Sequence, residues 1–173
     1  MDNGETYEAT GKYNYVATIT STIEGDAYWK DQATNEIVCV NKTFPYTLID
    51  NATFYSVEGT CPEDVVTRTI VTKNAGKTIL NVERSTKKAF TATGVVYIKN
   101  PTGEFDAETD LVLGGEGVRK GTAKYTDLTG TYAPSFNDTY LSGATVYVRP
   151  YMEFANGEPY YGDVVKFVNG VQQ

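Results

Sequence analysis

The sequence predicts an all-β protein built as an antiparallel β-sandwich, either one enlarged sandwich or two small ones, with a closed β-barrel as the alternative. Its 173 residues include 14 Tyr and 16 Gly, and Thr and Val are also abundant. This composition is typical of twisted, turn-rich sheets. No stretch of ten or more residues shows clean helical periodicity, so helices are not expected to shape the fold.

The clearest single element is a hairpin over residues 141–168. Its turn is Asn156-Gly157, a pair that tolerates the positive φ angles of a tight hairpin turn. The pairs expected on its apolar face are Val146 with Phe167, Val148 with Val165, Met152 with Tyr161, and Phe154 with Pro159. The pairs expected on its mixed, wettable face are Thr145 with Val168, Tyr147 with Lys166, Arg149 with Val164, and Glu153 with Tyr160. A slip of one residue would exchange the two faces, so this pattern determines the register.

The first half of the chain reads as short strands separated by turns. Residues 6–23 form one long strand or two collinear strands, with a bulge or bend at Gly11. Residues 24–36 are expected to be a loop that carries the single tryptophan. The strands expected next are 36–41, 44–49, 52–58, 64–73 and 77–84. The last two flank Asn74-Ala75-Gly76, which predicts a three-residue hairpin loop.

The second half continues the pattern up to the hairpin. The strands expected there are 90–99, 107–113, 118–126 and 130–136. Residues 101–110 are polar and could hold a helical turn at most. The polar stretch 85–89 is the expected boundary between a β-rich region, residues 1–85, and a sandwich, residues 86–173. A single domain over the whole chain is the alternative.

Composition excludes several classes of function. The net charge is −7 and the sequence pI is about 4.6, which argues against a nucleic-acid binder and against an anionic membrane surface. No apolar run approaches the roughly 20 residues that cross a bilayer. The chain has no histidine, which removes Ser-His-Asp and Cys-His catalysis and His-ligated metals. We therefore expect no enzyme, no cofactor and no metal.

Two cysteines, Cys39 and Cys61, both lie in strand-like sequence. A disulfide between them is the favoured interpretation and would imply an oxidising compartment. Two separate buried thiols are the alternative. The first ten residues are acidic and polar and do not resemble a secretion signal. We therefore expect either a mature secreted fragment or a protein exposed by another route, as virion parts are.

Residues 94–168 resemble the fibronectin type III-like and immunoglobulin-like modules of bacterial surface and phage virion proteins. The resemblance is carried by GVVYI at 94–98, GTYAPSF at 130–136, and LSGATVYVRPYMEF followed by YYGDVVKF. Val146 stands where such modules often have a tyrosine, which puts a tyrosine corner in doubt. The resemblance implies an antiparallel sandwich and a non-catalytic role, although fold alone does not establish function.

Aromatic residues supply the candidate binding sites. Trp29 with Tyr28 could stack on a sugar ring, but packing of Trp29 over the core is favoured. Tyr147, Arg149 and Tyr151 could form an outward protein-binding face, since Tyr and Arg are enriched at interfaces. Ordinary cross-strand pairing on a solvated sheet is an equal alternative. Carboxylates at Asp106, Glu108 and Asp110 are favoured as a solvated acidic loop rather than a Ca²⁺ site.

These observations leave several functions open. The favoured one is a structural subunit of an extracellular filament, appendage or virion that associates with itself or with other proteins through β-sheet contacts. Its N-terminal strand could be lent to a neighbouring chain. The residues of that expected assembly strand are Tyr7, Ala9, Tyr13 and Tyr15. The alternatives are a monomeric adhesin-like or glycan-binding surface module and a small barrel that holds an apolar ligand.

Overall fold

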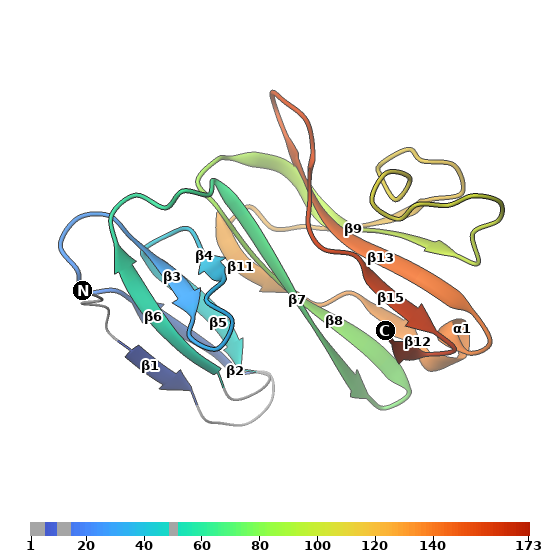
Figure 1. Ribbon diagram of the computed structural model, residues 1–173, viewed down its shortest axis with the longest axis horizontal. Helices are drawn as coiled ribbons and strands as arrows, with labels where there is room; N and C mark the ends of the chain where they lie inside the picture. Colours follow the sequence, from blue (N-terminus) through green and yellow to red (C-terminus); the bar gives the residue numbers. More distant parts are fainter. Residues whose placement is uncertain (1–5, 10–14, 49–51) are drawn as a thin grey trace. The chain divides into compact units, whose positions relative to one another are not determined.

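The computed structural model describes residues 6–9, 15–48 and 52–173, and it is all-β apart from one short helix, α1 (Asp138–Leu141) (Figure 1). The first strands are β1 (Thr6–Ala9), β2 (Tyr15–Thr20), β3 (Ala27–Asp31), β4 (Ile37–Cys39), β5 (Thr43–Leu48) and β6 (Ala52–Glu58). The later strands are β7 (Val65–Asn74), β8 (Lys77–Thr86), β9 (Phe90–Lys99), β10 (Arg119–Ala123), β11 (Thr129–Tyr132), β12 (Ser135–Asn137), β13 (Thr145–Phe154), β14 (Tyr160–Tyr161), β15 (Val165–Val168) and β16 (Val171–Gln172). They form several antiparallel sheets, none closed into a barrel, which confirms the predicted fold class. No helix in the described part of the chain is long and apolar enough to span a membrane.

The chain divides into two compact units whose segments alternate along the sequence. Unit 1 is made of residues up to Arg68, Glu83–Ala89 and Asp127–Thr131. Unit 2 is made of Thr69–Val82, Phe90–Thr126 and Tyr132–Gln173. The boundary expected after residue 85 falls inside β8, so no single cut of the chain separates these units.

Unit 1 contains a sheet with the order β1-β6-β3-β4 and a second, two-stranded sheet, β2-β5. Its core is aromatic: the ring of Phe54 lies 5.2 Å from that of Phe44 and 4.7 Å from that of Tyr46, both in edge-on geometry. The buried members of this core are Trp29, Val38, Cys39, Phe44, Tyr46 and Phe54. Such edge-on ring pairs add to the stabilisation from buried area.

Strand β3 lies inside the segment that was expected to be a loop, so that prediction is wrong. Its side chains are buried at Ala27, Trp29 and Asp31 and only half-buried at Tyr28 and Lys30. This alternation with a period of two is a strand signal. Most of the other residues in 24–36 are charged or polar, and for this reason the strand pattern was not recognised in the sequence.

Unit 2 contains a long sheet with the order β10-β9-β13-β15-β16, in which β14 also pairs with β13. One face of this sheet packs against residues of β8 and α1. The buried members of that core are Leu80, Val82, Val95, Tyr132, Leu141, Ala144, Val146, Val148, Val165 and Phe167. The opposite face is covered by the chain between β9 and β10, described below.

The predicted hairpin register is confirmed next to β15 and wrong further out. Val146 pairs with Phe167 and Val148 with Val165, as expected. Beyond them Met152 pairs with Tyr160, not with Tyr161. Three residues, 162–164, there oppose the two residues 149–150 of β13, so one extra residue bulges out and shifts the pairing.

Three smaller expectations also differ from the structure. Residues 107–113 form turns, because Asp106 accepts hydrogen bonds from the backbone N–H groups of Glu108 and Asp110 and so competes with strand pairing. The β7–β8 loop has two residues, since Asn74 still belongs to β7; Ala75 and Gly76 have φ angles of 49° and 76°. Helix α1 was not expected.

Candidate functional site in the loop between β9 and β10

The loop of residues 100–118, which joins β9 to β10, is the longest described connection between strands. It contains turns but no helix or strand. Loops longer than about 12–15 residues without secondary structure of their own are usually functional or disordered. This loop is held to the sheet by many contacts, which favours a functional role for it.

Arg149 on β13 fastens the loop to the sheet. Its Nη1 donates to the backbone oxygen of Glu108 at 2.8 Å, and its Nη2 lies 2.8 Å from the Glu108 carboxylate. Its Nε donates to the backbone oxygen of Gly162 at 2.7 Å. The Arg149 side chain is only 12% exposed, and its guanidinium lies 5.3 Å from the Tyr161 ring centroid. One planar cation thus joins the loop, β13 and the bulge after β14.

Apolar contacts hold the same loop. Leu111 is fully buried in a cluster with Val96, Ile98 and Tyr151. The Phe105 ring lies 5.2 Å from that of Tyr147, and the backbone N–H of Leu113 donates to the Tyr161 hydroxyl at 2.9 Å. The loop is therefore packed on the sheet and does not extend freely into solvent.

The three residues expected to form an outward protein-binding face lie together, but under this loop. Tyr151 is 1% exposed, Tyr147 is half-buried against Phe105, and Arg149 binds the loop. Their expected exposure is therefore corrected. The Tyr-Val-Arg-Pro-Tyr alternation correctly places the three side chains on one face of β13. This aromatic and cationic face contacts residues 105–113 of the same chain.

Trp29 lies in the core of unit 1 and is fully buried. Its Nε1 donates to the backbone oxygen of Lys42 at 2.9 Å. The less favoured interpretation, stacking of Trp29 on a sugar, is therefore corrected, and the favoured one, packing in the core, describes the structure. Tyr28 points the other way from the same strand and is half-buried; burial is the main cause that raises the pKa of its hydroxyl.

Cys39 and Cys61 are both buried and both free thiols, so the predicted disulfide is absent. β3 separates β4, which carries Cys39, from β6, after which Cys61 follows in a turn. Cys39 Sγ donates to the backbone oxygen of Asn41 at 3.2 Å and lies 3.3 Å from Ser85 Oγ. Burial raises the pKa of the Cys39 thiol to about 11, so this cysteine is a weak nucleophile at neutral pH.

The residues of the expected assembly strand fall on two different strands. Tyr7 and Ala9 lie in β1 and pair with Phe54 and Ala52 of β6. Tyr15 begins β2 and pairs with Leu48 of β5. Tyr13 lies outside the described residues.

Sequence reasoning missed a buried ion cluster in unit 1. Arg68 Nη1 lies 3.1 Å from the Asp31 carboxylate, and Arg68 Nε lies 3.0 Å from that of Glu83. The guanidinium also lies 5.6 Å from the Tyr46 ring centroid and 5.5 Å from that of Phe54. The alternation of side chains along each strand assigns Arg68 to one face of TRTIVT and Glu83 to one face of NVER. It does not indicate that the two side chains meet. The cluster lies beside the aromatic core of unit 1.

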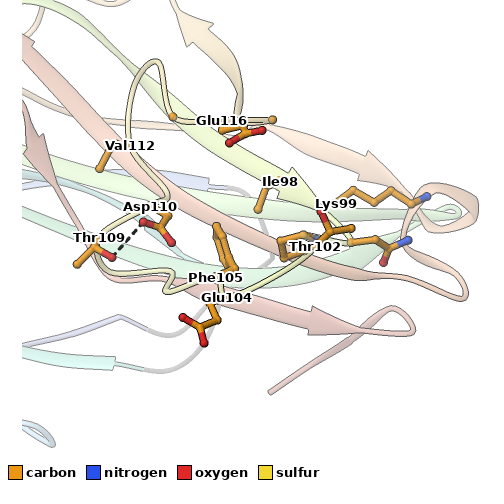
Figure 2. A pocket seen from close by; sticks show the side chains of 13 residues that line it. Ile98, Lys99, Thr102, Glu104, Phe105, Thr109, Asp110, Val112 and Glu116 are labelled. Carbon is orange, nitrogen blue, oxygen red and sulfur yellow. Dashed lines mark hydrogen bonds between the residues drawn. The ribbon is translucent and has the colours of Figure 1, made fainter.

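A hollow of about 590 Å³ opens beside the loop in unit 2 (Figure 2). Ile98 and Phe105 contribute its apolar lining, and Glu104, Asp110 and Glu116 contribute carboxylates. The Asp110 carboxylate accepts hydrogen bonds from the Asp106 N–H at 2.9 Å and from the Thr109 hydroxyl at 3.2 Å. Among the described residues, no group of three or more His, Cys, Asp or Glu side chains is placed to hold a metal ion.

The lining of this hollow can both donate and accept hydrogen bonds. Hydroxyl, amide and carboxylate groups lie around a hollow whose volume is within the range of about 300–1,000 Å³ typical of ligand pockets. Comparison with protein-family models, with curated proteins and with solved structures gave no match.

Proposed function

We propose that this chain is a non-catalytic structural module of an extracellular or surface-exposed assembly and that it contacts other protein chains through the edges of its β-sheets. The resemblance of residues 94–168 to fibronectin type III-like and immunoglobulin-like surface modules supports a role of this kind. So does the open architecture, because each sheet leaves edge strands whose backbone groups can pair with another chain.

The observation that carries the proposal is the difference between the two edges of the long sheet in unit 2. At one edge, β10 presents the exposed cations Arg119 and Lys120, and charged edges oppose pairing with further strands. At the other edge, β16 pairs with β15 through Val168 and Val171, which are 38% and 59% exposed. This edge is a two-residue strand that carries Val171 and Gln172, and its exposed valines offer apolar contact to another chain.

A second edge in unit 1 supports strand lending. β1 lies at the end of the order β1-β6-β3-β4 and pairs only with β6 among the described strands. The same four-residue register would accept β1 of a neighbouring chain in place of the chain's own β1. We propose this exchange as one route to assembly.

Sedimentation at micromolar protein tests the proposal. We expect particles much larger than the 19.0 kDa chain, a smaller average size for Val171→Lys, and loss of assembly with a retained β-sheet spectrum when residues 1–12 are deleted. Leu128→Lys is the matched control, because Leu128 is 41% exposed but lies outside every strand.

A 19.0 kDa monomer at all concentrations would overturn the structural-subunit proposal. It would favour the second candidate, a monomeric binding module, for which the anchored loop and its hollow are the specific observation. An assembly that survives deletion of residues 1–12 would refute strand lending only.

A further inference from the structure

A second, smaller hollow of about 340 Å³ lies next to the first in unit 2. It is lined by Lys99, Asn100, Gly117, Arg119 and Tyr140. None of these side chains carries a carboxylate, which is notable in a chain with a net charge of −7. The hollow presents hydrogen-bond donors, two of them cationic, and one aromatic ring.

The register of the sheet brings the two cations together. Arg119 of β10 pairs directly with Tyr97 of β9, and Lys99 lies two residues beyond Tyr97 on the same strand. Directly paired residues and residues two apart lie on the same face of a sheet. Arg119, Tyr97 and Lys99 therefore occupy one face, at the end of β9 where the loop begins.

The aromatic ring beside them is held in place. Lys99 Nζ lies 4.3 Å from the Tyr140 ring centroid and donates to the Tyr140 backbone oxygen at 2.6 Å. The Phe136 ring stacks on the Tyr140 ring, with the centroids 5.6 Å apart and the planes at an angle of 17°. Burial raises the pKa of the Tyr140 hydroxyl, Tyr97 adds to the rise, and Arg119 opposes it, so the Arg119 charge lies near that hydroxyl.

Several donors in this hollow are not used within the fold. Arg119 is exposed and makes no ion pair within residues 15–48 and 52–173. Asn100 accepts a hydrogen bond from the Thr145 N–H with its Oδ1 at 2.8 Å, and its Nδ2 group is a further donor. A guanidinium and an ammonium at one site match the two oxygens of a carboxylate.

The adjoining hollow restricts the kind of ligand. The two hollows share Lys99, Asn100 and Gly117, and the larger one adds the carboxylates of Glu104 and Glu116. Carboxylates accept hydrogen bonds from hydroxyl groups but repel a second anion. A ligand that spans both hollows thus carries one carboxylate followed by a neutral, hydroxyl-rich group.

We propose that the two hollows bind an acidic polysaccharide in which uronic acid alternates with an uncharged sugar. The uronate carboxylate binds Lys99 and Arg119 beside the edge of Tyr140, and the neighbouring sugar donates hydroxyl hydrogen bonds to Glu104 and Glu116. An acidic peptide fits less well, because successive carboxylates would meet the acidic wall. The inference is independent of the proposed assembly role.

Titration calorimetry in low salt tests this inference with a hyaluronan tetrasaccharide, which alternates glucuronate and N-acetylglucosamine. The neutral control ligand is tetra-N-acetylchitotetraose, and the peptide control is tetraglutamate. We expect binding of the hyaluronan fragment at least about tenfold tighter than of either control, as loss of a charge-assisted hydrogen bond predicts. Arg119→Gln and Lys99→Met should each weaken it about tenfold or more.

Lys120→Gln is the matched variant, because it removes the same charge from the same strand. Lys120 pairs with Val96, so its side chain lies on the opposite face of the sheet from Arg119. We expect a change of less than about twofold for this variant. Thermal melting of each variant establishes that it is folded.

Four results would overturn the inference. The first is no heat of binding with the hyaluronan fragment up to millimolar concentration. The second is equal loss of affinity in Lys120→Gln and Arg119→Gln, which would indicate attraction by net charge alone. The third is equally tight binding of tetraglutamate, which would indicate recognition of acidic peptide. The fourth is equal binding of tetra-N-acetylchitotetraose, which would refute a role for the carboxylate.

Discussion

Replacing Arg149 by Met should release the loop of residues 100–118 without unfolding the sheet. Methionine retains an apolar stem of similar length but removes the hydrogen bonds to the backbone oxygens of Glu108 and Gly162, at 2.8 and 2.7 Å. Hydrogen bonds from a charged group contribute about 1.5–3 kcal/mol each, and they are not additive. We expect the free energy of local opening to fall by about 2 kcal/mol, since the Leu111 anchor remains.

Hydrogen exchange measures this opening directly. A loss of about 2 kcal/mol corresponds to roughly 30-fold faster exchange, and residues 105–113 should show it while the amides of β9 and β13 stay protected. Glu108→Gln is the control. It removes an ion pair with a carboxylate that is 66% exposed, and exposed pairs contribute about 0–1 kcal/mol, so exchange should change little.

Two outcomes would refute this reasoning. Exchange in Arg149→Met that stays close to the wild-type rate would mean that the apolar anchors alone hold the loop. Equal acceleration in Glu108→Gln would mean that the ion pair, and not the backbone contacts of Arg149, fastens it.

Two further predictions concern unit 1. Trp29→Ala should cost about 3–5 kcal/mol of stability and lower the melting temperature substantially, because Trp29 is fully buried; an unchanged melting temperature would contradict the core assignment. Burial raises the pKa of the Cys39 thiol from its ordinary value of 9.0 to about 11, so the folded protein retains this proton longer than the unfolded chain. The thiol's contribution to stability is therefore fully present below pH 9 and falls by about 2–3 kcal/mol as the pH rises to 11. Urea unfolding of wild type and Cys39→Ala at pH 8 and pH 11 should show a smaller loss in the variant; parallel losses would refute it.

The sequence correctly predicted those strands and turns whose formation depends mainly on residues close together in the chain. The alternation of 52–58 and of 90–99 predicted β6 and β9 with their observed bounds. Asn156-Gly157 predicted the hairpin and its register beside β15. These features follow from turn chemistry and from side chains that alternate between two faces.

The candidate site could not be predicted in this way, because its contacts join distant parts of the chain. Arg149 and Glu108 are 41 residues apart in sequence, and neither residue's neighbours indicate the other. Because of the bulge at 162–164, Tyr161 pairs with Tyr151 and not with Met152, and so it lies on the other face of the hairpin. The sequence therefore predicted an aromatic and cationic face on β13 but not the loop that covers it.

The alternation of the two units along the chain has a consequence for dissecting the protein. Six segments alternate between the units, so a fragment cut at the apparent midpoint, such as residues 86–173, lacks Leu80 and Val82, which fill the core of unit 2. Neither half is a self-sufficient piece. Mixed together, however, the two halves would carry every segment of both units, which makes this chain a natural candidate for reconstitution from split fragments.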